Sequence, residues 1–357
     1  MKVYVGMSGG VDSSLTAALL LERGYAVTGV YMKNWSQDLP GMKCPWKEDY
    51  QDAQRVAVQL GIPFKLYDFQ TQYRQNVVDY MLDGYRSGIT PNPDVMCNQE
   101  VKFKLFLETA LHDGADMIAT GHYARVEPRA TGRGPQGATL HVAAHAEKDQ
   151  TYFLYRVTER ALSHSLMPIG EFATKAEVRA EAEKRGLATA RKKDSQGICF
   201  VGKVGIKDFL LHELGEQPHG DIIDQNGVRI GEHDGAIFYT IGQRQGLGVG
   251  GGLPYYVTGK DMTKNEVYVT TNLQDPTLWC DRLDLAQCHW INESPKQGRV
   301  YQVRTRYRAE LVPATFTWDD AYDRGELHME QSVRAITPGQ SAVLYDGARI
   351  LGGGIVI

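Results

Sequence analysis

The segment Lys2-Val-Tyr-Val-Gly-Met-Ser8-Gly-Gly-Val-Asp-Ser13 joins a β-branched run, a glycine pair and the beginning of a helix near Asp12. A strand, a tight turn and a helix in this order form one βα unit. The glycines permit a turn whose backbone N–H groups converge on one point. These groups, the Ser8 and Ser13 hydroxyls and the positive end of the helix can hold phosphate oxygens. The segment therefore predicts a phosphate-binding loop after the first strand.

Two other interpretations fit part of this loop. Gly6-Met-Ser8-Gly-Gly10 fits the G-x-S-x-G pattern of a hydrolase, but a serine on the first strand leaves no earlier strand to supply a second oxyanion donor. The second interpretation is an incidental glycine turn. The loop lacks the spacing G-x-x-x-x-G-K-[ST], which disfavours γ-phosphoryl hydrolysis of the usual kind. The later stretch 246–251 fits G-x-G-x-x-G, but Pro254 and a strand-like run follow it, so it predicts a loop of a β domain.

The pattern along the chain predicts more than one domain. A chain of 357 residues that is 42% hydrophobic divides into two or three folding units. Up to about Gly186, short β-branched runs alternate with helical stretches, which predicts a Rossmann-like parallel sheet and an α/β class. Short strands with turn pairs then predict a small β-rich domain and a C-terminal antiparallel β-barrel or sandwich. The expected boundaries are 1–202, 203–276 and 277–357, the expected strands are Val3–Gly6, Val27–Met32, Phe64–Phe69 and Met117–Thr120, and the expected helix-ending glycines are Gly24, Gly61 and Gly114.

Net charge, apolar runs and cysteine count disfavour several classes of protein. The net charge of −4 gives no overall attraction for nucleic acid, so any such binding needs a local basic surface. No run is long and apolar enough for a membrane span and no targeting pattern precedes the first strand, so we expect a cytoplasmic protein. The five cysteines are odd in number and form no C-x-x-C, so a disulfide framework and a zinc site have little support. Individual thiols remain candidates for chemistry.

The densest polar cluster is Thr90-Pro-Asn-Pro-Asp94-Val-Met-Cys97-Asn98, which precedes a helical run. If Asn98 caps that helix, Cys97 lies at its positive end, where a thiolate is stabilised. Asp94 is held by prolines and could act as a general acid or base. A buried structural thiol and a turn-capping carboxylate explain the two residues about equally well from placement alone.

Two further segments contain clustered Lys or Arg residues. Cys199 follows Lys192 and Lys193, cations that would favour a thiolate or persulfide anion. Strand alternation over residues 300–308 would place Arg304, Arg306 and Arg308 on one face, as a stripe that follows an RNA backbone. A solvated sheet face is the equally plain alternative for this stripe.

Several motifs together resemble the tRNA-specific 2-thiouridylase family, within the superfamily of ATP pyrophosphatases that share a phosphate loop (PP-loop). The resemblance extends over nearly the whole chain. It rests on Gly6 to Ser13, Asn92-Pro-Asp-Val-Met-Cys97-Asn, Gly121-His-Tyr123, Lys148-Asp-Gln150, Asp194-Ser-Gln-Gly-Ile-Cys199-Phe and Thr337-Pro-Gly-Gln340. It implies an N-terminal domain like the adenine nucleotide alpha hydrolases. Gln196 and Gln245 are polar departures from the family pattern that place neither cysteine in doubt.

The resemblance also implies roles for individual residues. The catalytic residues would be Cys97 as nucleophile, Cys199 as persulfide carrier and Asp94 for proton transfer. The implied ATP contacts are Gly6, Met7, Ser8, Gly9, Gly10, Val11, Asp12, Ser13, Met32 and Gly121. The implied contacts with the target base and the tRNA are Asn92, Pro93, Asp94, His122, Lys148, Asp149, Gln150, Arg306, Tyr307 and Gln340.

The implied reaction adenylates the 2-oxygen of the wobble uridine with ATP and Mg²⁺, and then replaces it with sulfur. Persulfide on Cys199 would attack C2 directly, or Cys97 would first release sulfide; an iron–sulfur cluster on Asp94, Cys97 and Cys199 is a further possibility. The expected partners are tRNA for Lys, Glu and Gln and a persulfide donor or relay protein. The competing functions are an amide-forming ligase that uses ammonia, which the paired cysteines disfavour, and an RNA-binding module that nucleotide regulates.

Overall fold

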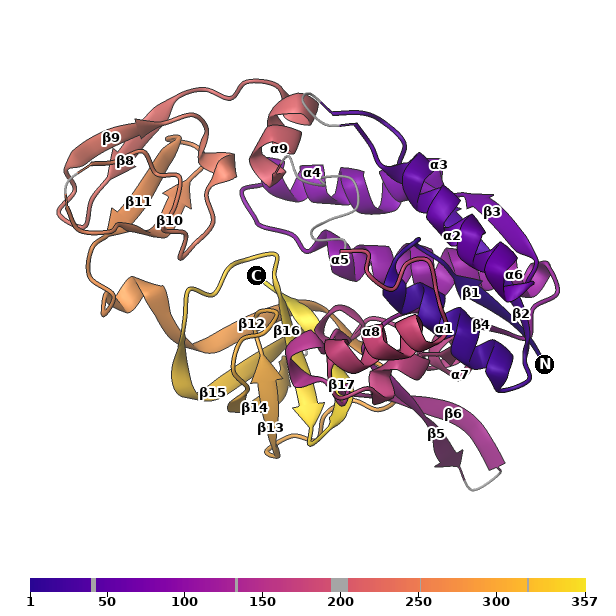
Figure 1. Ribbon diagram of the computed structural model, residues 1–357. Helices are drawn as coiled ribbons and strands as arrows, with labels where there is room; N and C mark the ends of the chain where they lie inside the picture. Colours follow the sequence, from indigo (N-terminus) through magenta and orange to yellow (C-terminus); the bar gives the residue numbers. More distant parts are fainter. Residues whose placement is uncertain (40–42, 132–133, 194–204, 251, 320) are drawn as a thin grey trace.

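The computed structural model describes residues 1–39, 43–131, 134–193, 205–250, 252–319 and 321–357. Within these ranges the strands form three sheets (Figure 1). Cys199, with the rest of its motif, lies outside the described residues.

The N-terminal sheet is parallel throughout, with the strand order β3-β2-β1-β4-β7. Along β1, Val3 and Val5 pack into a core on one face while Tyr4 packs into a core on the other, as side-chain alternation requires. The α/β prediction is confirmed, and every predicted strand is present to within a residue or two. The strands are β1 (Lys2–Gly6), β2 (Ala26–Lys33), β3 (Phe64–Asp68), β4 (Met117–Ala119) and β7 (Ser165–Leu166).

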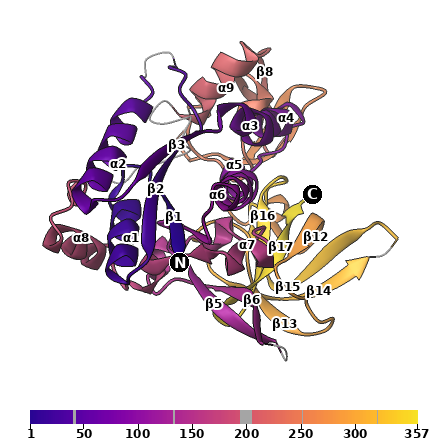
Figure 2. The same cartoon turned by 90° about the vertical axis from the view of Figure 1, so that its right-hand side faces the viewer.

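Helices cover both faces of this sheet (Figure 2). The glycines expected to end helices, Gly24, Gly61 and Gly114, all have positive φ, as left-handed C-terminal residues do. On one face lie α1 (Val11–Glu22), α2 (Trp46–Leu60) and α8 (Lys175–Lys184). On the other lie α4 (Asp79–Arg86) and α6 (Phe106–His112), with the short α3 (Gln70–Tyr73), α7 (Glu159–Ser163) and the π-helical η1 (Arg74–Val78) nearby.

The helix that carries Cys97 begins earlier than expected. It runs without a break through α5 (Pro93–Met96), the π-helical η2 (Cys97–Leu105) and α6. Its N-cap is Asn92, whose Oδ1 accepts from the Val95 N–H at 3.4 Å. The prediction that Asn98 caps the helix is wrong, because Pro93 occupies the first helical position, which suits its fixed φ. Cys97 therefore lies just beyond the first turn, where π-helical geometry of a kind common at functional sites begins.

The central part forms a small β sheet after the predicted helix, as expected. Helix α9 (Ile206–Leu214) leads into a sheet of order β10-β11-β8-β9. Gly227 has a φ of 76° in the turn between β8 and β9, where a positive φ favours glycine. The strands are β8 (Gly220–Ile223), β9 (Arg229–His233), β10 (Tyr256–Asp261) and β11 (Glu266–Thr270).

The C-terminal strands form an antiparallel barrel, as predicted. Pairing between β12 and β17 closes it. A hairpin from the N-terminal half, β5 (Arg125–Thr131) and β6 (Gly134–His141), continues the same sheet because β6 pairs with β17. The barrel strands are β12 (Trp279–Trp290), β13 (Val300–Arg304), β14 (Val312–Asp319), β15 (Arg324–Arg334), β16 (Ser341–Asp346) and β17 (Arg349–Val356).

The predicted arginine stripe is wrong as a feature of one strand face. Strand β13 ends at Arg304, so Arg306 and Arg308 lie in the following turn. Arg304 lies 5.4 Å from the Tyr345 ring and 3.5 Å from Asp149. Arg308 has a φ of 63° and donates to the Glu147 carbonyl at 3.1 Å. The alternation fails because the strand ends at Arg304, four residues before Arg308.

All three parts of the chain meet beside the start of the Cys97 helix, in what we call the three-domain junction. Thr90 donates its N–H to the Pro338 carbonyl at 2.9 Å and accepts from Gln340 Nε2 at 2.7 Å. Its hydroxyl lies 3.2 Å from that of Thr240 in the central domain. Arg306 Nη2 donates to the Ile241 carbonyl at 3.1 Å and to the Thr337 hydroxyl at 2.9 Å. The junction therefore consists of Thr90, Thr240, Ile241, Arg306 and 337–340.

We predict that Gly339→Ala disrupts this junction. Gly339 has a φ of 91°, and a Cβ there would lie 2.9 Å from the Thr90 backbone. Gly347 is the matched control, with a φ of 61° and no atom within 4 Å of its Cβ position. Gly347→Ala should cost about 1–2 kcal/mol of unfolding free energy and Gly339→Ala about 2–4 kcal/mol. Urea denaturation measures both, and equal losses would contradict the close contact.

Candidate active site

The phosphate-binding loop is closed by its own hydrogen bonds. Ser8 donates its N–H to Ser13 Oγ at 3.1 Å, and Ser13 Oγ donates to the Gly10 carbonyl at 3.2 Å. Gly9 has a φ of 75°, and a Cβ there would lie 2.3 Å from the Asp49 carbonyl oxygen. Only glycine fits this position without a shift of the backbone. The loop thus leads directly into the N-terminus of α1, where N–H groups remain available to an anion.

The predicted nucleotide residues outside the loop gather around it. A Cβ on Gly6 would lie 2.9 Å from Met32 Cε, and a Cβ on Gly121 would lie 2.8 Å from the Ser13 nitrogen. The carboxyl ends of β1, β2 and β4 therefore meet at one point. This is the edge of an open α/β sheet at which ligands bind.

Asp12 anchors a charged cluster beside the loop. Its carboxylate accepts from Lys175 Nζ at 2.7 and 2.8 Å and from the Tyr123 hydroxyl at 2.9 Å. Lys175, at the start of α8, was not among the predicted ATP residues. No local pattern indicates this contact, because it is the folding of α8 onto α1 that brings the ammonium to Asp12. Lys175 is therefore a candidate phosphate contact that no sequence motif indicates.

Asp94 and Cys97 lie close together near the start of their helix. Residues three apart share one face of a helix. Burial raises the pKa of the half-buried Asp94 carboxyl, and the Lys102 ammonium partly offsets this. Cys97 is only 4% exposed. The arrangement suits a carboxyl that holds a proton more readily than usual, beside a thiol shielded from water.

His122 lies against the same helix and is 8% exposed. Its ring is 5.5 Å from that of Phe103, and its Nδ1 lies 2.8 Å from the Thr120 hydroxyl. Burial, followed by the charge of Lys102, holds the pKa of His122 well below its ordinary value of 6.5. The imidazole is therefore neutral at neutral pH, so it can act on a base or a nucleotide through hydrogen bonds but not as a cation.

Two of the predicted tRNA contacts, the buried Asp149 and the half-buried Gln150, are engaged in hydrogen bonds within the protein. Asp149 is 3% exposed and accepts from the Ala143 N–H at 3.0 Å and the Thr151 hydroxyl at 2.7 Å. Gln150 accepts from the Tyr123 N–H at 2.9 Å. These bonds hold the segment after His122 in place. Lys148, beside them, is half-buried.

An aromatic pair connects the helix to the barrel. The ring of Tyr307 lies 4.5 Å from that of Phe153, and the Arg308 guanidinium lies 5.1 Å from the Tyr307 ring. The Phe153 carbonyl accepts from Asn98 Nδ2 at 3.1 Å. Tyr307 thus packs on Phe153, which in turn is bonded to Asn98 on the helix that carries Cys97. Arg306 and Gln340 instead belong to the three-domain junction.

Cys44, Cys280 and Cys288 have the surroundings of structural thiols. Burial raises the pKa of Cys44 and Cys280, and it raises that of Cys288 to about 11. A thiol with a raised pKa is a poor nucleophile at neutral pH. Among the described residues, no group of three or more His, Cys, Asp or Glu side chains is placed to hold a metal ion.

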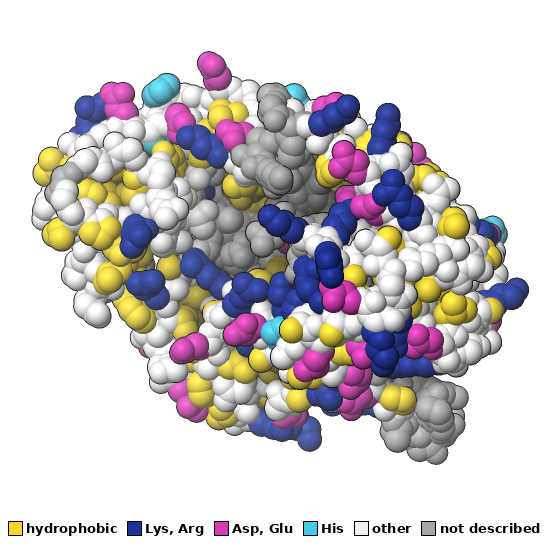
Figure 3. Space-filling model, viewed as in Figure 1, with side chains coloured by type: hydrophobic (Ala, Val, Ile, Leu, Met, Phe, Trp, Pro, Cys, Tyr) yellow, Lys and Arg dark blue, Asp and Glu magenta, His cyan; other side chains and the backbone are white. Residues whose placement is uncertain are grey.

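Charge and shape on the surface vary locally. Figure 3 shows Lys and Arg side chains gathered around the hollow in the middle of one face, although the net charge of the chain is −4.

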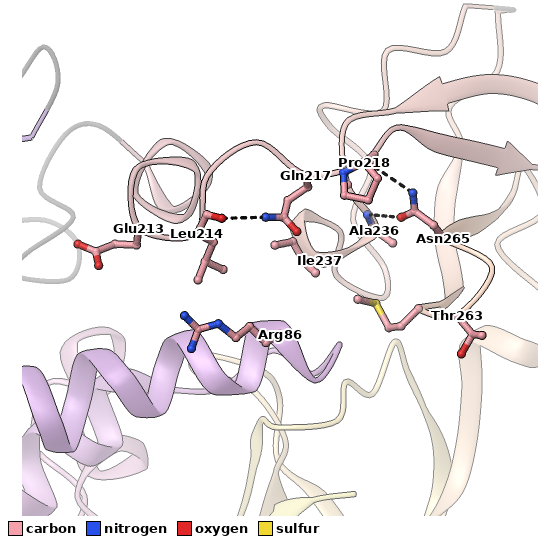
Figure 4. Close-up of a pocket in the computed structure, with 11 residues that line it drawn as sticks. Arg86, Glu213, Leu214, Gln217, Pro218, Ala236, Ile237, Thr263 and Asn265 are labelled. Carbon is pink, nitrogen blue, oxygen red and sulfur yellow. Dashed lines mark hydrogen bonds between the residues drawn. The ribbon is translucent and has the colours of Figure 1, made fainter.

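A separate open pocket of about 490 Å³ lies between the end of α4, the end of α9 and the central sheet (Figure 4). Arg86, Gln217 and Asn265 are among its lining residues, and none of the predicted site residues is. In the part of the chain that the structure describes, no helix is long and apolar enough to cross a membrane.

The fold and the loop define a class: a nucleotide-binding α/β domain joined to two β domains. Residues 1–203 match the family model of the tRNA methyl transferase HUP domain, residues 207–271 that of the tRNA methyl transferase PRC-barrel domain, and residues 280–356 that of the aminomethyltransferase beta-barrel domain.

Full-length relatives carry the name tRNA-specific 2-thiouridylase MnmA. That of Bacillus subtilis (strain 168) is 46% identical over 358 residues, which cover 99% of this chain and 94% of the relative. That of Enterococcus faecalis (strain ATCC 700802 / V583) is 43% identical over 362 residues, with coverage of 99% and 95%. The chain belongs to the tRNA-specific 2-thiouridylase family, as the motifs indicated.

We predict that Gly9→Ala weakens ATP binding by at least about tenfold, because it forces strain at a positive φ and moves the loop off Asp49. Gly10→Ala is the matched variant. Gly10 has a φ of −95°, and the nearest atom to its Cβ position is Ser8 Oγ at 3.5 Å. The loss of ATP affinity in Gly10→Ala should be clearly smaller than in Gly9→Ala. Calorimetric titration with ATP compares the two, and equal affinities would place the nucleotide elsewhere.

A second prediction concerns pH. An ionised Asp94 that accepts protons loses activity as the pH falls through its pKa, which lies above the ordinary 3.8. Lys102→Met removes the cation that lowers this pKa, so the acid limb of kcat/KM should move to higher pH. Lys104→Met is the control, because Lys104 is exposed and pairs with Glu100 at 2.7 Å. An acid limb that stays in place in the Lys102 variant would remove Asp94 from the proton transfer.

Proposed function

We propose that this chain is an ATP-dependent sulfurtransferase that converts the wobble uridine of tRNA to 2-thiouridine. The observation that carries the proposal is the phosphate-binding loop, joined in one domain to a helix that holds a carboxyl and a thiol three residues apart. The names of the full-length relatives support the same chemistry. The family models for the first two domains carry a methyl transferase name instead, which a product analysis separates from thiolation.

In the first half-reaction the uridine O2 attacks the α-phosphorus of ATP and pyrophosphate leaves. An amide-like oxygen is a poor leaving group, whereas the O-AMP ester leaves readily. The proposed ATP contacts are those that the motifs implied, with the addition of Lys175, whose ammonium lies at the loop. The target base must leave its stack to reach this site.

Mg²⁺ fits this site as an ion carried by the nucleotide. Mg²⁺ is commonly held by one or two carboxylates together with substrate phosphates, and Asp12 is the carboxylate of the loop. When bound, the ion would neutralise charge on the departing pyrophosphate. Lys175 and Tyr123 orient the Asp12 carboxylate from the protein side.

Sulfur transfer follows at C2. The terminal sulfur of a Cys199 persulfide forms the C2–S bond and AMP leaves. Cys97 thiolate then attacks the sulfur still bonded to the Cys199 side chain, which breaks the S–S bond and yields 2-thiouridine and a Cys97–Cys199 disulfide. In the second route Cys97 attacks the persulfide first and releases sulfide, which attacks C2. Asp94 accepts and returns the protons in both routes, and two electrons from a reductant restore the thiols.

The partners follow from this chemistry. They are the tRNAs for Lys, Glu and Gln, and a protein that delivers persulfide sulfur to Cys199 in the cytoplasm. We propose residues 1–202 as the catalytic domain, 203–276 as the central domain and 277–357 as a barrel that contacts tRNA. The proposed base and tRNA contacts are Asn92, Pro93, Asp94, His122, Lys148, Gln150, Arg306, Tyr307 and Gln340. Asp149, which is buried, would hold this segment in place from the interior.

Mass spectrometry of nucleosides tests the function. tRNA incubated with the protein, ATP, Mg²⁺ and a persulfide donor should contain 2-thiouridine, and omission of ATP should abolish it. Cys199→Ser and Cys97→Ser should both abolish the product while ATP binding persists. Cys280→Ser is the control, because Cys280 is a half-buried thiol of the barrel with a raised pKa.

The outcomes are distinct. A methylated nucleoside in place of 2-thiouridine would overturn the proposal, and so would thiolation without ATP. Full activity of Cys199→Ser with the persulfide donor would remove Cys199 as the carrier. Activity that requires iron and sulfide bound to Asp94, Cys97 and Cys199 would replace the persulfide routes with the cluster route.

A further inference from the structure

Asn98 is buried with only half of its amide satisfied. It is 3% exposed, and its Nδ2 donates to the Phe153 carbonyl at 3.1 Å. Its Oδ1 is buried and has no hydrogen-bond partner among the residues that the structure describes. A buried acceptor without a partner lowers stability, so its presence in a folded protein calls for an explanation.

The orientation of this amide is fixed by its neighbour. The Phe153 carbonyl can only accept, so the amide nitrogen must face it. A flip would place two acceptors against each other and would lose the 3.1 Å bond. The unpaired atom is therefore the oxygen, and the site offers an acceptor without a donor.

Asn98 lies next to the proposed catalytic residues Asp94 and Cys97. It follows Cys97 directly and comes four residues after Asp94, so its side chain lies one turn along from the Asp94 carboxyl. Phe153, to which it is bonded, lies 4.5 Å from the Tyr307 ring. Aromatic side chains of this kind are what an unstacked base packs against. A base that reached Asp94 and Cys97 would thus present its edge to Asn98.

We propose that Asn98 Oδ1 accepts a hydrogen bond from the N3–H of the target uracil and so selects uracil over cytosine. This inference rests on the proposed function. Uracil carries one ring N–H, at N3, next to the reacting C2, whereas the N3 of cytosine is an acceptor that would face the Asn98 oxygen. An acceptor fixed at N3 therefore identifies the base by the one ring N–H that uracil has and cytosine lacks. Enzymes read extruded bases through this edge.

The test compares two anticodon stem-loop RNAs, one with uridine and one with 3-methyluridine at the target position. Their binding to the full chain is measured without ATP, so that chemistry does not contribute. Wild type should prefer uridine. Asn98→Ala should weaken uridine binding by about 10- to 100-fold, because the N3–H loses its partner. It should leave 3-methyluridine binding unchanged or improved, because the methyl group gains room. Glu108→Gln is the control on the same continuous helix, because Glu108 is exposed.

The outcomes separate recognition from structure. Equal losses on the two RNAs, or no loss on uridine, would overturn the inference and leave Asn98 as the site of an ordered water or a packing residue. If Asn98→Ala does not fold, Asn98→Leu keeps the branched shape without polar atoms and carries the same expectation. Absence of 2-thiouridine formation by wild type would instead contradict the proposed function.

Discussion

The hydrogen bonds between Thr90 and the barrel loop 337–340 hold the chain just before the helix that carries Asp94 and Cys97. Thr90 donates to Pro338 and accepts from Gln340, and only Pro91 separates it from the N-cap residue Asn92. Two prolines, at 91 and 93, restrict the backbone between this contact and Asp94. The position of Asp94 and Cys97 is therefore set by the barrel as well as by the parallel sheet. A tRNA that bound the barrel, as proposed, would act on the same structural unit that carries Asp94 and Cys97.

A second set of contacts makes this unit rigid. The hairpin β5–β6 leaves the N-terminal domain and pairs with β17, so the barrel sheet contains strands from the N-terminal half as well as from the C-terminal part of the chain. Arg156 donates to the Gln287 carbonyl of β12 at 2.8 Å and bonds to Gln99 on the catalytic helix. Sites built on such a scaffold hold their geometry better than sites on loops. The catalytic chemistry needs this precision, because sulfur and C2 must meet at bonding distance.

Local signals predicted the N-terminal sheet well and the barrel surface poorly. Strands β1 to β4 and the glycines at positions 24, 61 and 114 depend on patterns a few residues long, which the sequence displays directly. The capping residue was misassigned because both Asn92 and Asn98 are good N-caps, and Pro93 decides between them. The arginine stripe failed because the end of β13 depends on its pairing with β14 and β16. Lys175 was missed because its contact with Asp12 spans 163 residues.

The buried polar groups of this site lower the stability of the fold and are consistent with a site that its substrate completes. Burial raises the pKa of Asp94, so the folded chain binds its proton more readily than the unfolded chain does. Between the two pKa values, stability therefore falls as the pH rises, and it stays lower where Asp94 is ionised. Asn98 adds an acceptor without a partner among the described residues. A base that donates an N–H to Asn98 and exchanges protons with Asp94 would offset both losses of stability. The same buried surroundings strengthen each such hydrogen bond, because water does not compete for it.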